Sequence, residues 1–422
     1  MRTLEIDALV IGGGVQGLML LHDLKKKGYS VLLLELNKLG GGQTSHSHVF
    51  IHPGYLCRKP SLVREFKEGH DRWQHLLGPE LIASSCMEML VGFDDEIDAT
   101  EQQILWKSLN PALAAEERRP PAEFGDSCLT RTFGAKVNAP TSEAVMEALL
   151  SDATGCLAKV VTVESFKFQP KHIEEVEVEF NRGDRAIIKP RAVLLAAGTG
   201  NEKLLRKLLP VATPNVQWNR NANLLVLTGN VESESPLFGG HFVVSGNGIS
   251  IAQRRFHRRV VWLISDSRVA STGHETHSQA QWFDNLFDDL LGLAPSLFAD
   301  PTQWKWGMHR ATKAEGWDVY RWPYSGRIEK FGFDNLWTVW PTFLTLAPLL
   351  SARVCEAIEK GPGSDGGHCA AVTPFWETPQ MSEEYWKQHL RDKQLQPWDE
   401  FSGSIERSAI NMPPEDDYGG PS

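Results

Sequence analysis

The sequence predicts an α/β protein in which a Rossmann-like dinucleotide-binding domain is interleaved with an α+β domain that carries an antiparallel sheet. Three observations predict this fold. A β-α-β pattern surrounds a glycine motif within the first 36 residues. An apolar strand that ends in Ala-Ala-Gly follows about 180 residues later. Short strands of alternating polarity fill residues 222–268, which favours an antiparallel sheet.

The first β-α-β unit is the best-defined part of the chain. Residues 5–11 (EIDALVI) form an apolar run that is typical of a buried parallel strand. The next segment has apolar residues at helical spacing, lysines in its last turn and a terminating glycine at Gly28. A second strand, SVLLLEL, then ends at Glu35. The unit therefore predicts a strand, a helix and a parallel neighbouring strand.

The glycine motif lies between the first strand and the helix, as Gly12-Gly13-Gly14-Val15-Gln16-Gly17. Gly12 permits a tight turn, Gly14 lets the backbone approach a pyrophosphate, and Gly17 lets helix and strand pack closely. The free N–H groups and the dipole at the helix start then favour a diphosphate. Glu35 lies 18 residues beyond Gly17, where its carboxylate can accept hydrogen bonds from a ribose diol. The motif in this context predicts a dinucleotide site.

Further elements follow along the chain. The Ala-Ala-Gly strand ends at Gly198; we expect it to return the chain to the nucleotide domain, with an ordinary buried strand that ends in a glycine turn as the alternative. A segment Leu344-Thr345-Leu346-Ala347-Pro348 opens the last strong helix, with Thr345 as its expected cap. That helix start could stabilise negative charge on a reduced flavin, although an ordinary core helix is the alternative. The pattern also predicts helices at 61–78, 143–153, 279–297 and 346–359, and a run of three strands at 172–198.

Composition narrows the class of protein. The chain has 422 residues, enough for two or three domains, with 41% hydrophobic and 23% charged residues, as in a globular protein with a core. Its net charge of −10 disfavours a nucleic-acid partner. Six isolated cysteines indicate reduced thiols and a cytoplasmic location. No run reaches the roughly 18 apolar residues of a spanning helix, which leaves at most peripheral membrane association.

The N-terminal region resembles the D-amino-acid oxidase-like superfamily of FAD-dependent oxidoreductases. The resemblance lies in IGGGVQGLMLLHDLKKKGYSVLLLEL and the following GGGQTSHSHVFIHPGY. Residues 43–54 are most similar to the QTGHNSGVIHAG segment of L-2-hydroxyglutarate dehydrogenases, and Lys59-Pro60-Ser61-Leu62 is similar to their KPGSL. The resemblance implies an FAD-binding domain of the glutathione-reductase type and a substrate domain interleaved with it.

The resemblance also implies a set of site residues. Around the cofactor, Thr44 and Ser45 join the glycine motif and Glu35, Val161 contacts the adenine side, and His46 lies near the isoalloxazine. The full expected FAD set is Gly12, Gly14, Val15, Gln16, Gly17, Glu35, Thr44, Ser45, His46, Val161, Gly198, Leu344 and Thr345. A covalent flavin through His46 or His48 stays open, and no metal is expected because His46-x-His48 has no third ligand nearby.

Two residues are the expected catalytic candidates. His52 matches the histidine of the family's IHxG segment and is a candidate base or substrate ligand, with an ordinary hydrogen-bonded loop residue as the alternative. Arg310, in WGMHRA, could bind a substrate carboxylate, or could be a surface residue paired with Glu315. Phe343 stands where the family has a glycine-rich approach to the flavin.

The function expected from these residues is oxidation of a CH–OH or CH–NH group on a small carboxylate-bearing substrate, with hydride transfer to flavin N5. The electron acceptor (oxygen, quinone or protein) is open. The alternatives are a tailoring or maturation flavoenzyme for a larger metabolite or peptide, and a non-catalytic flavoprotein partner. The expected domains are FAD-binding parts at 1–80, 140–210 and 331–361, substrate parts at 81–139 and 211–330, and a partly disordered C-terminal extension at 362–422.

Overall fold

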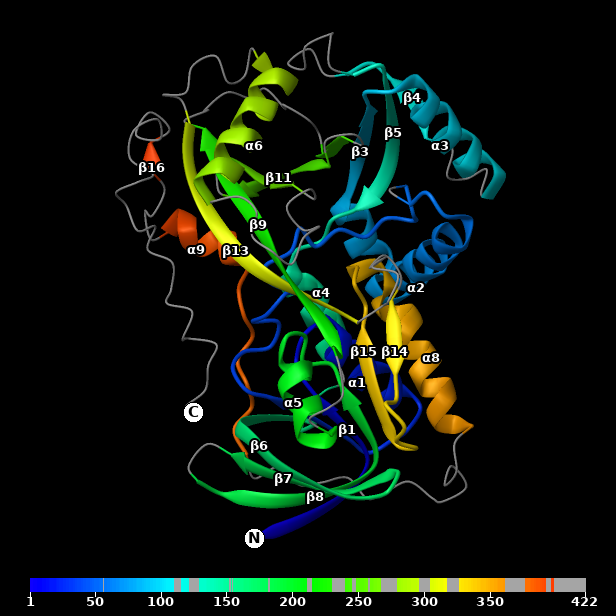
Figure 1. The fold of residues 1–422 in the computed structure, drawn as a ribbon, viewed down its shortest axis with the longest axis vertical. Coiled ribbons are helices and arrows are strands. Elements are labelled where there is room, and N and C mark those ends of the chain that lie inside the picture. The colour runs from blue at the N-terminus through cyan, green and yellow to red at the C-terminus, as the bar shows by residue number, and fades with distance from the viewer. Residues whose placement is uncertain are drawn as a thin grey trace.

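The fold is built on two separate β-sheets with helices packed around them (Figure 1). The structure is a computed structural model. It describes residues 1–55, 57–109, 115–120, 129–151, 153, 155–180, 183–210, 215–229, 240–244, 248–256, 259–266, 279–295, 304–316, 326–360, 376–391 and 396–397.

The first sheet has the order β1-β2-β6-β7-β8-β15-β14, and β1 also pairs with β8. β1 is parallel to both β2 and β8, β2 is parallel to β6, and β8 is parallel to β15. β6, β7 and β8 form an antiparallel meander. The bounds are β1 Arg2–Ile11, β2 Val31–Glu35, β6 Leu157–Gln169, β7 His172–Phe180, β8 Arg185–Leu195, β14 Arg327–Glu329 and β15 Leu336–Trp340. The predicted mixed α/β class is confirmed.

The expected run of three strands over 172–198 is wrong. Residues on both sides of Pro190 belong to one strand, β8, and the third strand of the meander is β6, which precedes this run. Pro190 lies between Ile188, the last residue paired with β7, and Val193, the first paired with β15. β1 runs beside β8 through this point, with Ile6 opposite Pro190, so the sheet holds β8 as one strand across the proline.

Helices cover this sheet and enclose its core. α1 (Val15–Lys26) packs against α4 (Ser142–Leu150) and α8 (Ala347–Glu359), and Leu18 and Leu21 are fully buried among them. α2 (Pro60–Ser85) runs beyond the predicted helix, with an interruption at Gly78, whose φ is 74°. α5 (Gly200–Leu208) follows β8. The large apolar burial under α1 is what the helical spacing of the sequence predicts.

The second sheet has the order β16-β13-β9-β12-β11-β10-β3-β5-β4. Its pairs are antiparallel except β10 with β3, and the strands within 222–268 pair with one another in the antiparallel way that the sequence predicts. The exception arises because β3 and β10 are far apart in the chain and meet through a crossover rather than a hairpin. The bounds are β3 Cys86–Phe93, β4 Glu116–Arg118, β5 Arg131–Asn138, β9 Gln217–Gly229, β10 Gly240–Val244, β11 Ile249–Phe256, β12 Arg259–Asp266, β13 Trp304–Gly316 and β16 Gln396–Pro397.

The two sheets meet through β9 and β13. In Figure 1 these long strands run from the second sheet down toward β15 of the first. α6 (Gln279–Leu293) lies over the second sheet, and α3 (Glu96–Leu109) lies at its outer end. The strands of each sheet come from alternating parts of the chain. The domain boundaries expected from the sequence stay a prediction.

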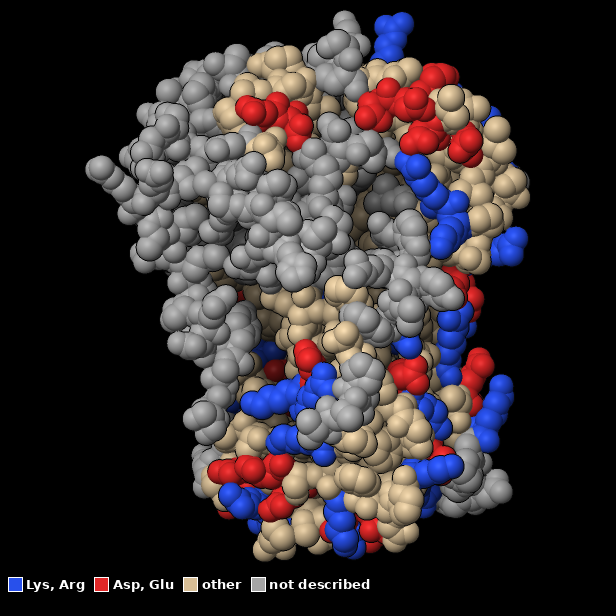
Figure 2. Space-filling view, viewed as in Figure 1, with Lys and Arg blue, Asp and Glu red and all other residues tan. Residues whose placement is uncertain are grey.

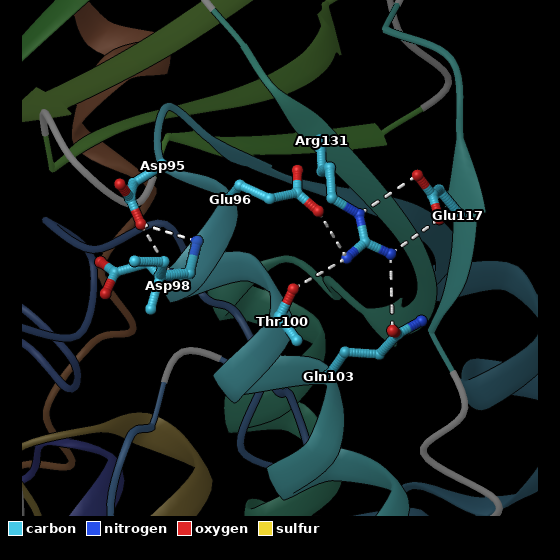
Figure 3. A network of polar contacts seen from close by, with 8 residues as sticks. Asp95, Glu96, Asp98, Thr100, Gln103, Glu117 and Arg131 are labelled. Atoms are coloured by element: carbon cyan, nitrogen blue, oxygen red, sulfur yellow. Dashed lines mark hydrogen bonds and ion pairs between the residues drawn. The ribbon is translucent and has the colours of Figure 1, made fainter.

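Arg131 ties α3 to the edge of the second sheet (Figure 3). Its guanidinium donates to Glu117 Oε2 at 2.8 Å and to Gln103 Oε1 at 3.4 Å, and it pairs with Glu96 at 3.4 Å. The hydrogen bond to Glu117, and to a smaller extent the charge of Glu96, raise the pKa of Arg131. The network is structural, and it lies at the outer end of the second sheet.

Charges of both signs lie side by side on the lower half of the face in Figure 2, which gives no continuous basic patch there. Within the described ranges, no helix is long and apolar enough to cross a membrane. The four described cysteines form no disulfide, and no described group of three metal-binding side chains could hold a metal ion.

Candidate cofactor and substrate site

The glycine turn between β1 and α1 leaves no room for side chains. Gly12 has a φ of 110°, and a Cβ there would lie 2.5 Å from Ala197 Cα at the end of β8. A Cβ on Gly17 would lie 1.8 Å from the carbonyl oxygen of Gly12. The first glycine thus provides the turn, and the last brings α1 against the strand, as the motif requires.

The start of α1 has the features of an anion site. Gly14 is the N-cap and, as a glycine, has no side chain of its own to cap the helix. A Cβ on Gly14 would meet only Thr44 Oγ1, at 3.4 Å, so the space in front of the helix is open. Val15 N–H donates to Thr44 Oγ1 at 3.0 Å. Gln16 is buried, and its Oε1 has no hydrogen-bond partner among the described residues. These features fit a bound diphosphate.

Glu35 lies at the end of β2, next to the glycine turn. Its two oxygens accept hydrogen bonds from Gly13 N–H at 2.6 Å and from Asn37 N–H at 2.8 Å. Burial raises the pKa of Glu35, and these backbone donors oppose that rise. A carboxylate has about four acceptor positions. Glu35 therefore keeps acceptor capacity for the hydroxyls of a ribose.

Val161 lies beyond the carboxyl end of β2. The last pair between β2 and β6 is Glu35 with Lys159, and Val161 falls at a register shift between Val160 and Thr162. Its side chain is 46% exposed, unusual for a large apolar residue in this sheet. A bulge with an unpaired backbone at this position can receive the edge of a base. Gly198, at the end of β8, has a φ of 57°, which favours glycine there.

The histidine loop, residues 45–52, continues from Thr44. Ser45 N–H donates to Gly40 O at 3.0 Å, and the side chain is buried. Burial lowers the pKa of His46 to about 4, and its ring lies edge-on to Tyr385 at 5.1 Å. The guanidinium of Arg254, from β11, donates to the carbonyl oxygen of His48. Burial, with Arg254 as a smaller cause, lowers the pKa of His48 to about 3.

His52 is enclosed by aromatic rings. It is 2% exposed, and its ring lies 4.8 Å from Phe66, 5.3 Å from Phe50 and 6.5 Å from Phe343. Burial, and to a smaller extent His70, lowers its pKa to about 3. Gly54 N–H donates to His52 Nδ1 at 3.2 Å. Because Nδ1 is the acceptor, the neutral ring carries its proton on Nε2 and can donate there.

The start of the last helix differs from the expectation. A 3₁₀ turn, η4 (Leu344–Leu346), precedes α8, and Leu346 is the N-cap, with no side-chain cap. The expectation that Thr345 caps this helix is therefore wrong. Thr345 lies inside the 3₁₀ turn, and its Oγ1 accepts a hydrogen bond from His52 N–H at 3.2 Å instead. The hydroxyl thus joins the histidine loop to the turn.

α2 holds this turn from the other side. Trp73 Nε1 donates to the carbonyl oxygen of Leu344 at 2.9 Å. A Cβ on Gly69 would lie 2.2 Å from the carbonyl oxygen of Thr345. Gly69 is therefore the residue that lets the helix approach the turn. Neither residue was predicted, although a glycine inside a predicted helix is a signal of close packing.

β13 lies beside Phe343 and the loop before Thr44. Ala314 N–H donates to Gln43 Oε1 at 3.3 Å, which brings the strand against the loop before Thr44. Lys313 Nζ lies 4.5 Å from the centre of the Phe343 ring and 3.0 Å from Glu315 Oε1. The backbone of Arg310 pairs with Asn223 of β9, and its side chain lies outside the described part of the structure. Glu315, the alternative partner considered for Arg310, is paired with Lys313.

The predicted residues thus come together in two groups. Gly12 to Gly17, Glu35 and Thr44 meet at the start of α1, and His52 meets Thr345 at the start of α8. The two groups are joined by Gln16, whose Nε2 donates to Ala347 O at 3.4 Å. Sequence reasoning missed residues that hold these groups from distant segments, namely Gly69, Trp73, Arg254, Lys313 and Tyr385.

The comparisons with known proteins agree with this geometry. The chain is 26% identical over 415 residues to an FAD-dependent oxidoreductase of Pseudomonas aeruginosa, covering 92% of this chain and 98% of the relative. The crystal structure of that oxidoreductase superposes with a TM-score of 0.69 at 22% identity, over 92% of this chain and 99% of the other.

Two structures of enzymes with known substrates share the fold. L-proline dehydrogenase from P. horikoshii has a TM-score of 0.64 at 16% identity, over 85% of this chain and 94% of its own. Glycine oxidase from Geobacillus kaustophilus has a TM-score of 0.61 at 16% identity, over 90% of this chain and 100% of its own. The model of the FAD dependent oxidoreductase (DAO) family matches residues 7–339. The chain belongs to this DAO family of FAD-dependent oxidoreductases, which confirms the resemblance expected from the sequence.

Proposed function

We propose that this FAD-dependent oxidoreductase oxidises the CH–NH group of a small amino or imino acid that carries a carboxylate, by hydride transfer to flavin N5. The observation that carries the proposal is the state of His52, a buried neutral ring that accepts through Nδ1. The sequence led us to expect either a CH–OH or a CH–NH substrate, and our proposal is limited to CH–NH.

The first step of the proposal places FAD. Gly14, Val15, Gln16 and Thr44 would hold its diphosphate at the start of α1, where Thr44 already accepts from Val15 N–H. Glu35 would accept from the ribose, and Val161 would contact the adenine at its bulge. Ser45, His46, Gly198, Leu344 and Thr345 complete the expected set. The buried Oε1 of Gln16 has no partner in the described part of the chain, and a bound ligand would be one way to satisfy it.

The flavin supplies a hydride acceptor when it is bound. Oxidation of a CH–OH group also needs a base for the hydroxyl proton. His52 does not meet that need, because Nδ1 accepts from Gly54 N–H and Nε2 carries the proton. A neutral amine needs no such base, since its own lone pair assists loss of the hydride. His52 therefore acts as a hydrogen-bond donor that orients the substrate.

The substrate carboxylate needs a cation. Arg310 on β13 is the proposed ligand, because a guanidinium binds a carboxylate through two parallel hydrogen bonds. Lys313, three residues later on the same strand, lies next to Phe343 and is neutralised by Glu315. The similarity of the fold to L-proline dehydrogenase and glycine oxidase, each an amino-acid enzyme by its name, supports a substrate of this class.

The test is an anaerobic titration of the purified flavoprotein with amino acids, N-alkyl amino acids and 2-hydroxy acids, followed by flavin absorbance. We expect bleaching by members of the first two classes. Bleaching by 2-hydroxy acids alone would contradict the amine proposal and favour a CH–OH substrate. A flavin that dithionite reduces but that no small acid bleaches would point to a larger substrate or a non-catalytic role.

A further inference from the structure

We propose that the C-terminal segment 376–391, called the strap, is a wall of the cofactor site, and that Glu384 and Tyr385 are positioning residues for FAD. The inference rests on the proposed place of FAD at α1 and the loop that follows β2. In Figure 1 the strap runs from β6, along the side of the molecule, up to α9 (Tyr385–Arg391) beside the second sheet.

The strap begins on the adenosine side of the proposed site. Trp376 Nε1 donates to Leu157 O of β6 at 2.7 Å, and its ring stacks on Phe180. Lys159 N–H then donates to Glu377 O at 2.8 Å. Lys159 is the residue paired with Glu35. The strap therefore lies against the strand that carries Val161, at the edge where the ribose and adenine are proposed to lie.

The strap next follows the loop after β2. Leu39 N–H donates to Gln380 O, and Ser382 N–H donates to Leu39 O, both at 2.8 Å. Leu39 and Met381 form a parallel bridge. Tyr385 N–H then donates to Ser45 O at 3.3 Å, and its ring meets His46. One short segment thus contacts the loop at both of its ends, around Thr44.

A buried carboxylate fixes the strap. Glu384 is 1% exposed, and its Oε1 accepts from Ser142 N–H at the start of α4 at 3.2 Å. Lys387 pairs with Glu384 at 3.1 Å and with Glu143 at 2.8 Å. A buried charge of this kind is stable only when it is paired and hydrogen-bonded. The strap is therefore locked by a specific network, not laid loosely on the surface.

The same segment reaches the second sheet. Trp386 is 3% exposed and packs with Val226, Ala252, Val261 and Leu263. Arg254, two residues from Ala252 on β11, donates to His48 O, and its charge interacts with Glu384. The histidine loop is thus clamped between the second sheet and the strap. If FAD orders this loop, it must also stabilise the docked strap, because coupling between two sites is reciprocal.

Hydrogen–deuterium exchange on the full wild-type chain, without FAD and saturated with FAD, tests this coupling directly. We expect FAD to slow exchange in peptides of 376–387 by about tenfold, together with peptides of α1. Slower exchange in α1 with no change in the strap would overturn the coupling alone. No change in α1 would overturn the proposed FAD seat and, with it, this inference.

Matched variants separate positioning from folding. Tyr385→Ala removes the ring that meets His46 and should weaken FAD binding about tenfold, whereas Tyr385→Phe keeps the ring and should bind within about twofold of wild type. Glu384→Gln should also weaken FAD binding. The control is Glu359→Gln, which removes an ion pair with Lys27, 2.6 Å long, that lies away from the loop, and it should leave FAD binding unchanged. Equal FAD affinity in Tyr385→Ala and Tyr385→Phe, with both apoproteins folded by circular dichroism, would contradict the proposal.

Discussion

The glycine turn at Gly12–Gly17 and the histidine loop at 45–52 line one site but are shaped by different forces. In the turn, backbone packs on backbone, since a Cβ on Gly17 would lie 1.8 Å from Gly12 O. In the loop, side chains from distant segments hold the backbone, among them Thr345 and Arg254. Local sterics thus form the turn proposed to hold a diphosphate, and long-range contacts form the loop proposed to hold a substrate.

The difference teaches which part of the site can vary between relatives. A turn made by glycines accepts one kind of residue, so its ligand is the same wherever the pattern occurs. A loop held by distant contacts changes whenever any of those segments changes. Under the proposed function, substrate choice would therefore depend on the loop and its partners, and cofactor choice on the turn.

The largest effect is expected from a methyl group in the turn. Gly17→Ala places a Cβ in the Gly12 carbonyl, and overpacking of this kind should cost about 3 kcal/mol of unfolding free energy and most of the bound FAD. Gly42→Ala is the matched control, because a Cβ there meets nothing within 4 Å. Urea unfolding and flavin absorbance measure both quantities. A Gly17→Ala protein with wild-type stability and flavin content would break the comparison.

The histidine loop should respond to pH where the turn does not. Burial lowers the pKa of His46 to about 4 and the pKa values of His48 and His52 to about 3, against an ordinary 6.5. Below pH 6.5 the unfolded chain binds protons that the folded chain does not, so stability falls as pH falls toward 4. Each histidine contributes up to about 1.4 kcal/mol per pH unit, or about 2 kcal/mol at pH 5.

The variant His52→Gln sharpens this prediction. The loss of stability between pH 7.5 and pH 5, measured by urea unfolding, should be about 2 kcal/mol smaller in the variant than in wild type. An unchanged pH dependence would mean that His52 is protonated with an ordinary pKa in the folded protein, and that its burial among aromatic rings is wrong.

Trp73 tests how strongly α2 holds the turn before α8. Trp73→Phe removes the donor to Leu344 O and should lower the unfolding free energy by about 1 kcal/mol beyond the change in ring packing. Trp106→Phe is the control. Trp106 is also fully buried, but its Nε1 has no hydrogen-bond partner in the described part of the chain. Equal losses in the two variants, by urea unfolding, would show that the bond contributes nothing.

The smallest effect is expected at Arg131, which lies in neither region. Arg131→Gln removes the pairs with Glu117 and Glu96 (Figure 3), but these carboxylates are exposed, and exposed ion pairs contribute little. The unfolding midpoint should fall by less than in Trp73→Phe, and FAD affinity should stay at the wild-type value. A drop in FAD affinity would reveal coupling between the outer end of the second sheet and the cofactor seat.

The contrast between local sterics and long-range contacts also explains which elements could be predicted from the sequence. β1, α1 and β2 were predicted because apolar spacing and glycines act over a few residues. The continuous β8 was missed because the strand that lies beside Pro190, β1, comes from a distant part of the chain. The role of Thr345 was missed because its hydroxyl bonds to His52, 293 residues away.

The C-terminal extension shows the same limit. Trp376 and Trp386 of this extension pack against the rest of the protein, while Trp398 and the last residues lie outside the described part of the chain. No local pattern could show that Tyr385 would meet His46, because that contact depends on the whole path of the strap.

The central mechanistic claim is that His52 is a neutral hydrogen-bond donor and that the substrate amine provides the only ionisation needed for reduction. The direct test is the rate of anaerobic flavin reduction by the best amine substrate, measured from pH 6 to pH 10 in wild type and His52→Gln. The account predicts a rate that rises with the ionisation of the substrate amine and has the same apparent pKa in both proteins. An ionisation near neutrality that is present in wild type and lost in His52→Gln would show that His52 is the base, and would contradict the account.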